Sequence, residues 1–296
     1  IEKNKKKFID LDFDLSETLQ IPIINYKKEN KEPSNIKTKI VIDNKTYLID
    51  QFLFKANKSK IGIKKLKLQN DLSFKNVQKL NIKTTDQKNK INNEFSIEIG
   101  NNIEIKGKKY DATNLIKFFN KDEKENSFKN LNKKIQINFD QISNSYDPIY
   151  KFNLIGEIKK GQFVKISSKG EFSEGKYLDI SLQKDKKGKK KYIEIYSDHP
   201  KFLLSQNKFF NGLVDGKLLF TSVYDDNESL SNLSLEEFKV ANAPGFVKLL
   251  SLADLGGMAD MVSGEGLSFD KMELKLNTNK DLLKINELYA IGPSIS

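Results

Sequence analysis

The chain has 296 residues, of which 38% are hydrophobic and 31% are charged, a composition typical of folded proteins. It contains no cysteine, which excludes disulfides and thiolate metal sites, and it has no uncharged apolar run of about 18 residues, so we expect no membrane-spanning helix in it. The net charge is +11, but all 51 basic residues are lysine. Because reading of base edges relies on the planar guanidinium group of arginine, we expect no nucleic-acid partner.

Apolar and polar residues alternate from one end of the chain to the other, which predicts half-buried antiparallel strands. The clearest segments are residues 8–15, 36–42, 95–99, 135–139, 152–158, 177–182, 192–196, 233–240 and 269–276. Polar clusters at 184–188, 225–229 and 277–281 separate several of them and predict hairpin turns. We therefore expect a mainly β protein built around an elongated antiparallel sheet.

The first of these segments carries three acidic residues, Asp10, Asp12 and Asp14, which resemble the opening of a calcium loop. The calcium pattern then needs a glycine and a final glutamate, where this chain has Leu15 and Ile21. The intervening apolar residues instead make the three carboxylates the solvated face of a strand. We expect no metal site and no cofactor.

Three segments have apolar residues at helical spacing and predict short amphipathic helices near 112–120, 200–210 and 245–263. The first follows Asp111 and the second follows Asp198, each a candidate helix cap. The third is a helix pair that breaks at two consecutive glycines, 256–257.

The residue inventory offers little for catalysis. His199 is the only imidazole, and its neighbour Pro200 at a helix entrance indicates a role in a turn. The Asp and Glu residues are scattered and form no evident acid–base pair. We expect no enzymatic activity.

The segment 241–293 gives the most specific signal. It begins with Asn-Ala-Pro at 242–244, continues through the apolar helix pair to Ser-Gly-Glu-Gly-Leu-Ser-Phe-Asp at 263–270, and ends in two strands that close on Gly292-Pro293. This order closely resembles the C-terminal region of the AsmA-like family, nearest its YhdP-type branch. The resemblance is specific over about residues 105–296, whereas over 1–105 only the strand rhythm agrees.

The resemblance implies a curved β-groove in an envelope protein that is anchored in the inner membrane and implicated in moving phospholipid to the outer membrane. It divides the chain into a β-rich segment, 1–105, and an AsmA-like C-terminal region with the short helices, 106–296. It implies a periplasmic location and contact with membranes through an anchor outside these residues. Because the chain begins at Ile1 rather than Met, we expect it to be a piece of a longer protein.

The candidate binding residues are the apolar side of the helix pair and the inward side of the strands. They are Phe152, Leu154, Ile193, Ile195, Phe246, Leu249, Leu250, Leu255, Met258, Met261, Val262, Phe269, Leu274 and Leu276. Such residues form ordinary core if a second sheet packs on them, or an apolar trough if none does. Because such a trough can hold lipid, we expect binding and conduction of phospholipid acyl chains between the two membranes. The alternative is a non-enzymatic structural or assembly factor of the envelope that binds a protein partner through the same surface.

Overall fold

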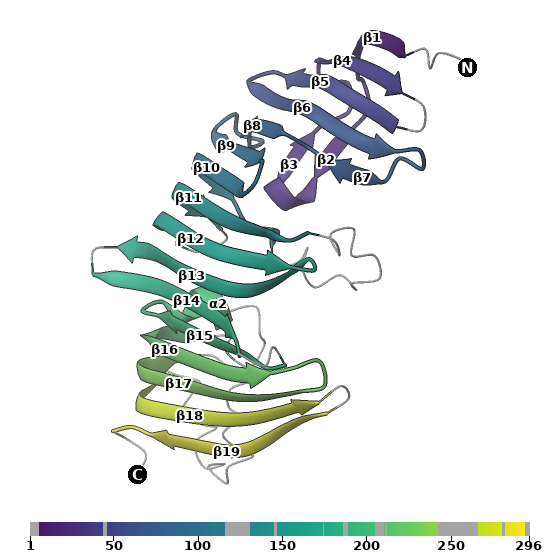
Figure 1. Ribbon diagram of the computed structural model, residues 1–296. Coiled ribbons are helices and arrows are strands. Elements are labelled where there is room, and N and C mark those ends of the chain that lie inside the picture. Colours follow the sequence, from purple (N-terminus) through teal and green to yellow (C-terminus); the bar gives the residue numbers. More distant parts are fainter. Residues whose placement is uncertain are drawn as a thin grey trace. The chain divides into compact units, whose positions relative to one another are not determined.

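The computed structural model describes residues 6–43, 46–115, 131–144, 147–173, 175–185, 189–204, 210, 212–241, 266–279 and 282–293. Over these residues the protein is mainly β, as the alternating pattern predicts (Figure 1). Two compact units divide the chain, unit 1 (Ile1–Gln162) and unit 2 (Phe163–Ser296), and each is described by itself. The boundary expected at 105–106 falls within a strand of unit 1.

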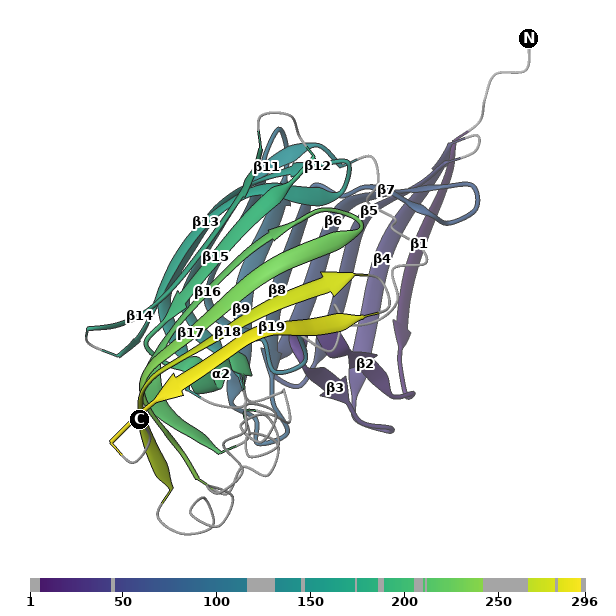
Figure 2. The same cartoon turned by 90° about the horizontal axis from the view of Figure 1, so that it is seen from below.

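Unit 1 contains a twisted sheet whose main strands alternate apolar and polar residues, and these strands are long because few turn residues interrupt them (Figure 2). They are β1 (Lys7–Asp14), β4 (Ser34–Asp43), β5 (Thr46–Ala56), β6 (Ser59–Gln69), β7 (Phe74–Asn76), β8 (Lys79–Thr85), β9 (Ile91–Ile99), β10 (Ile103–Asp111), β11 (Lys133–Ser143) and β12 (Ile149–Lys159).

Within unit 1 the strands pair in the order β1, β4, β5, β6, β8, β9, β10, β11, β12, and the short β7 pairs with the end of β6. All of these pairs are antiparallel except β10–β11, which is parallel. A parallel pair cannot be closed by a tight hairpin, and residues 112–132 connect these two strands.

A separate two-stranded hairpin follows β1. It consists of β2 (Leu19–Ile21), a 3₁₀ turn η1 (Pro22–Ile24) and β3 (Tyr26–Lys28). Asn25 adopts left-handed backbone angles after the turn, a conformation that asparagine tolerates better than most residues. We call the segment from β2 to β3 the cap hairpin (Figure 1).

Unit 2 is an antiparallel meander, and the polar clusters at 184–188, 225–229 and 277–281 each lie at the junction of two consecutive strands of it. Its strands are β13 (Gln162–Ser173), β14 (Lys176–Lys184), β15 (Lys191–Ser197), β16 (Leu213–Tyr224), β17 (Glu228–Val240), β18 (Leu267–Asn279) and β19 (Leu283–Ile291). At the turn after β16, the Asp225 carboxylate accepts hydrogen bonds from the backbone N–H groups of Asn227 and Glu228, which lowers its pKa.

Helix is scarce among the described residues. The helix predicted near 200–210 is present as α2 (Pro200–Leu204), and the described part of that segment also includes Phe210. The helix predicted near 112–120 lies mostly outside the described residues, and the helix pair predicted at 245–263 lies wholly outside them. Within the described ranges, no helix combines the length and apolar character needed to cross a bilayer.

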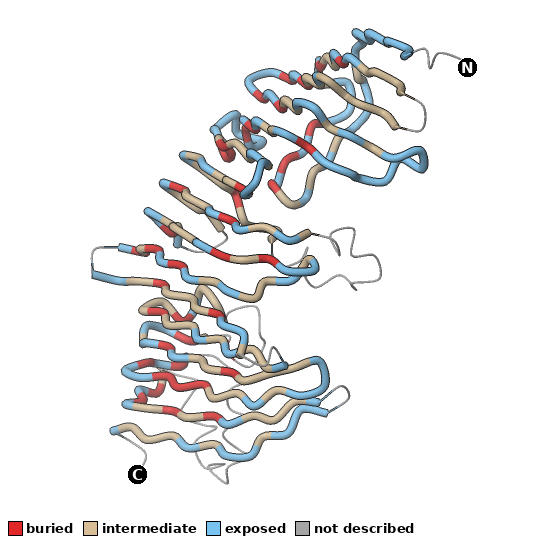
Figure 3. Tube along the Cα trace, in the orientation of Figure 1, coloured by how far each residue is buried: buried red, intermediate tan, exposed pale blue. Residues whose placement is uncertain are grey.

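The strand predictions from the sequence are confirmed. Every segment predicted to be a strand falls on a strand of the structure, and buried residues alternate with exposed ones along many of them (Figure 3). Asp10, Asp12 and Asp14 lie along β1 opposite polar residues of β4. The Asp12 carboxylate is 2.6 Å from the Lys37 Nζ, and the Asp10 carboxylate is 3.7 Å from the Lys39 Nζ.

Candidate apolar binding surface

Two neighbouring rows of apolar side chains cross the sheet of unit 1 on one face. Their members stand directly opposite one another at each strand pairing, and the two rows share a face because their positions on each strand are two residues apart. We call one the covered row: Ile36, Phe54, Ile61, Ile82, Phe95, Phe139 and Phe152. We call the other the open row, which is apolar except on β4, where Thr38 stands between Leu11 and Phe52: Leu11, Thr38, Phe52, Ile63, Leu80, Ile97, Ile105, Ile137 and Leu154.

The covered row crosses β10 at Gly107, and this glycine allows the aromatic rings on either side to meet. Gly107 stands opposite Phe95 on β9 and opposite Phe139 on β11. Strands two positions apart are separated by about 9.6 Å, yet the two ring centroids are only 5.5 Å apart. A Cβ atom at Gly107 would lie 2.2 Å from the Cβ of Phe95, so only glycine fits here. Tyr110 stacks on Phe139 at 5.4 Å and extends the aromatic cluster.

The cap hairpin packs on the covered row. Ile24 and Tyr26 of the hairpin are each only 4% exposed, and they belong to the same buried cluster as Phe54 and Phe95. The Tyr26 ring meets the Phe54 ring edge-on, with the centroids 6.2 Å apart. The hairpin therefore gives this part of the sheet the second layer that its apolar side chains require.

A buried polar network, which we call the clasp, fixes the cap hairpin to the ends of β8, β9 and β10. Asn93 is fully buried, and its Nδ2 donates to the Ile24 carbonyl at 2.7 Å and to the Thr84 hydroxyl at 2.8 Å. Its Oδ1 accepts from the backbone N–H of Asp111 at 2.9 Å. Each polar atom of the Asn93 side chain is thus satisfied, which a buried amide requires.

Further hydrogen bonds of the clasp reach the turn of the cap hairpin. The Asn25 Nδ2 donates to the Asp111 carboxylate at 2.9 Å, and the Asn92 Nδ2 donates to the Asn25 carbonyl at 3.2 Å. The Tyr110 hydroxyl donates to the Ile23 carbonyl at 2.9 Å. Burial, with the nearby Asp111 charge, raises the pKa of Tyr110 to about 12, so this hydroxyl keeps its proton at neutral pH.

The second strand of the cap hairpin ends in a buried lysine. Lys28 is 0% exposed, and its Nζ donates to the carbonyl oxygens of Ser16, Glu17 and Glu29 at 3.1, 2.8 and 3.1 Å. The three ammonium protons therefore have three acceptors, which offsets the cost of burying the charge.

The open row lies alongside the part of the sheet that the cap hairpin covers. Phe52, Ile97, Ile105 and Ile137 are only partly buried and contact the edge of the buried cluster. Leu11, at the β1 end of the row, is 40% exposed. The row runs across nine strands, about 38 Å at the usual strand spacing, and it is continuously apolar from β5 to β12.

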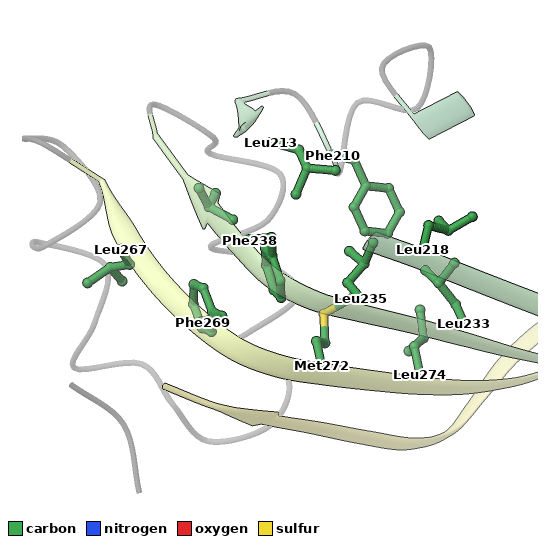
Figure 4. Close-up of a cluster of buried hydrophobic side chains, with 11 residues drawn as sticks. Phe210, Leu213, Leu218, Leu233, Leu235, Phe238, Leu267, Phe269, Met272 and Leu274 are labelled. Atoms are coloured by element: carbon green, nitrogen blue, oxygen red, sulfur yellow. The ribbon is translucent and has the colours of Figure 1, made fainter. Parts of the chain in front are cut away.

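In unit 2 the apolar rows are buried more deeply (Figure 4). One row runs through Leu218, Leu235 and Met272, which are 2%, 0% and 0% exposed, and the next includes Leu233 and Leu274. The Phe238 and Phe269 rings stack with centroids 4.9 Å apart. Phe210 and the α2 residues Leu203 and Leu204 pack against these rows.

Irregular backbone positions keep the deep part of the unit 2 core on a single face. Asp215 and Glu237 have positive φ angles of 57° and 53°, and the regular pairing of β16 with β17 is interrupted beside them, at Gly216 and Glu237, without a change of register. A residue in the left-handed region departs from extended geometry, so it interrupts the alternation of side chains along its strand. Phe238 consequently points to the same face as Leu235, although the two are three residues apart.

Seven of the fourteen predicted binding residues fall within the described residues of the strands. Phe152 lies in the covered row and Leu154 in the open row of unit 1. The other five are in unit 2: Phe269 and Leu274 are buried in its core, Ile195 and Leu276 pack partly buried against that core, and Ile193 is half-buried. The remaining seven lie in the predicted helix pair, outside the described residues: Phe246, Leu249, Leu250, Leu255, Met258, Met261 and Val262.

The sequence interpretation missed most of the open row. Its unnamed members on β5 to β11 are Phe52, Ile63, Leu80, Ile97, Ile105 and Ile137. The signal was present on β6 and β8, where Ile61 with Ile63 and Leu80 with Ile82 are spaced by two. The pairing register, which aligns these separate pairs into one row, cannot be read from any single strand.

The described residues contain no cluster of three or more His, Asp or Glu side chains that could hold a metal ion. His199, the single imidazole, lies beside the Phe172 ring with the centroids 5.2 Å apart. In the same region the Tyr196 hydroxyl donates to the Asp198 carboxylate at 2.6 Å, and this hydrogen bond raises the pKa of Tyr196 to about 12.

Comparisons of the chain with protein-family models, with curated proteins and with solved structures gave no match. The apolar rows therefore have to be interpreted from their own geometry. They present apolar side chains with no reactive group among them, an arrangement suited to holding an apolar ligand by contact.

Proposed function

We propose that this protein binds phospholipid acyl chains along the open row and conducts them between the inner and outer membranes, as the resemblance to the AsmA-like family implies. The observation that carries the proposal is the open row itself, which crosses nine strands of unit 1 and presents apolar side chains on every one of them except β4. On this proposal the protein acts in the periplasm as part of an inner-membrane-anchored protein, and no covalent step is involved.

The energetics of acyl transfer favour a long apolar strip. Each buried methylene contributes about 0.8 kcal/mol, so a 16-carbon chain that leaves a bilayer for water loses roughly 12 kcal/mol. A ligand that moves along a row of similar apolar side chains exchanges one contact for another and meets no such barrier. The open row offers such contacts at successive strands, for example at Ile97, Ile105 and Ile137.

The opposite face of the same strands is suited to water. Between the apolar positions of β8 to β11 lie residues such as Lys83, Glu98, Lys106 and Gln136, all of which are exposed. One apolar face and one charged face on a single sheet distinguish a lipid-carrying surface from a membrane-embedded one.

The proposal is tested by purifying the chain from bacterial cells, identifying co-purified lipid by mass spectrometry, and labelling the protein with a photo-crosslinkable phospholipid. We expect co-purified phospholipid and crosslinks on the open row. The substitution Ile137→Asp should reduce labelling by at least about tenfold, because it places a carboxylate in the path of the acyl chain.

The matched control is Gln136→Asp, which introduces the same charge one residue away on the opposite, exposed face of β11. It should label as the parent does, and circular dichroism should show that both variants are folded. Absence of lipid from the parent protein, or equal labelling of the two variants, would contradict the proposal and favour the alternative, an envelope factor that binds a protein partner.

A further inference from the structure

The polar face of unit 1, opposite the apolar rows, contains a hollow of about 590 Å³ over strands β5 to β10. This volume lies within the range of roughly 300–1,000 Å³ that is usual for small-ligand sites. We call it the basic hollow. All of its lining residues belong to unit 1. Besides residues of the polar face, they include Phe52 and Ile63 of the open row and Ile82 and Phe95 of the covered row, which lie between the polar-face residues on the same strands.

The hollow exists because short side chains line up across the strands. Gly62 on β6 stands opposite Asn81 on β8, which stands opposite Ser96 on β9. Longer lysine side chains flank this transverse row two residues away on β6, at Lys60 and Lys64. A Cβ atom at Gly62 would have the Phe52 carbonyl oxygen, at 3.9 Å, as its only neighbour within 4 Å, so the floor of the hollow is open above this glycine.

The rim of the hollow is strongly basic. Five lysines and one glutamate contribute to its lining: Lys60, Lys64, Lys83, Lys106, Lys108 and Glu94. Two of the lysines have acidic partners, since the Lys83 Nζ lies 3.1 Å from Glu94 and the Lys106 Nζ lies 2.7 Å from Glu104. Lys60 and Lys64 form no ion pair with the described part of the chain.

The register brings like charges together at this rim. Lys60 stands directly opposite Lys55 on one side and directly opposite Lys83 on the other. Like charges at directly opposed positions destabilise a sheet, and a bound anion removes that cost. On the floor, the Asn81 amide and the Ser96 hydroxyl make no hydrogen bond within the described residues, which leaves two neutral donors beside the lysines.

We propose that the basic hollow binds a phosphate-bearing anion with at least two negative charges, held by Lys60 and Lys64 and by the neutral donors on the floor. Lysine binds phosphate as a point charge, and several lysines around one hollow suit a doubly charged group better than a single carboxylate. The phosphate belongs either to a soluble diphosphate or to a lipid headgroup, and the two sources share this chemistry.

The test uses the whole chain and inorganic pyrophosphate, titrated by calorimetry at low ionic strength. We expect saturable binding to one site. The double variant Lys60→Gln/Lys64→Gln should bind at least about tenfold more weakly, because two ammonium groups close to the anion are removed. Its matched control, Lys165→Gln/Lys239→Gln, changes the net charge equally at exposed lysines of unit 2 and should bind as the parent does.

A second variant separates a shaped site from a diffuse basic surface. Gly62→Leu fills the hollow without any change in charge, and it should weaken binding as strongly as the double variant does. In a parallel arm, flotation with phosphatidylcholine vesicles that contain cardiolipin, a lipid with two phosphates and two negative charges, against phosphatidylcholine alone, tests the headgroup as the source. Binding in either arm that both hollow variants weaken supports the proposal. Binding in neither arm, or a Gly62→Leu variant that binds as the parent does, overturns it.

Discussion

In unit 1 the two-stranded cap hairpin covers one transverse row of apolar side chains and leaves the neighbouring row half-buried, whereas in unit 2 two adjacent rows are buried around Leu235 and Met272. The sheets themselves are built alike, from alternating strands whose apolar residues stand opposite one another. The two units differ in the elements that pack on the apolar face of the sheet. This difference teaches that alternation decides which residues share a face, while the element packed on that face decides whether they are core or accessible surface.

The largest effect should come from the buried core of unit 2. Leu235→Ala removes a fully buried side chain, so the free energy of unfolding should fall by about 3 to 4 kcal/mol. Ile97→Ala in the open row of unit 1 should cost only about 1 kcal/mol, because that side chain is only partly buried in the folded protein. Urea denaturation measures both losses. Equal losses would remove the contrast between the two units.

The next effect concerns the clasp. Asn93→Ala leaves the Ile24 carbonyl and the Asp111 N–H without their buried partner, and should cost about 2 to 3 kcal/mol. It should also expose the covered row, which is measured as increased binding of a hydrophobic dye. Asn76→Ala, at an exposed position of β7, serves as the control. A stable Asn93→Ala variant that does not bind dye would show that apolar contacts alone hold the hairpin.

A smaller loss is expected at the glycine in the covered row. Gly107→Ala places a Cβ atom 2.2 Å from the Cβ of Phe95, so β9 and β10 must move apart, at a cost of about 2 kcal/mol. Gly62→Ala, in open space on the other face, should be neutral or slightly stabilising. Thermal denaturation distinguishes them, and equal midpoints would mean that the aromatic contact across Gly107 is not tight in solution.

The smallest expected effect is a change of stability with pH, which comes from one tyrosine hydroxyl in each unit. Tyr110 and Tyr196 both have a pKa of about 12 in the folded protein, above the ordinary value of 10.0. Between pH 10 and 12 the unfolded chain loses these protons while the folded protein keeps them, so stability is full below pH 10 and falls as the pH rises through this window.

Tyr110→Phe and Tyr196→Phe should each make that fall shallower, as measured by urea denaturation at several alkaline pH values. Burial is the largest cause of the raised pKa of Tyr110, whereas the hydrogen bond to Asp198 is the largest cause of the raised pKa of Tyr196. Asp198→Asn should therefore flatten the pH dependence further only when Tyr196 is present. An unchanged slope in all of these variants would contradict the assignment.

The strands and much of their inward face could be predicted from the sequence, but the cap hairpin that covers part of this face could not. Alternation at Ile135 to Phe139 and at Tyr177 to Leu182 was clear enough to place β11 and β14. β16 is not among the clearest alternating segments, because the left-handed residue Asp215 interrupts its period of two. The cap hairpin has only three residues in each strand, too few for a periodic signal, and the clasp bonds that hold it come from residues more than 60 positions away.

The candidate surface was predictable to a similar degree. Phe152 and Leu154 were identified from their own strand, yet the row that contains Leu154 depends on eight pairing registers that no local pattern specifies. The basic hollow was not foreseen at all. Its floor is formed by Gly62, Asn81 and Ser96, which lie on three different strands. Each of these residue types is common at exposed strand positions, so none of them by itself indicates a binding site.

The clasp also bears on the order in which unit 1 folds. Most strand pairs join neighbours in the chain, but the clasp bonds connect residues 67 to 87 positions apart, from Asn25 and Ile23 to Asn92, Asp111 and Tyr110. Closing so long a loop is entropically costly until the sheet between its ends exists. We therefore expect the cap hairpin to dock after the rate-limiting step, so that Asn93→Ala accelerates unfolding and leaves the folding rate nearly unchanged; a slowed folding rate in stopped-flow experiments would place the docking earlier.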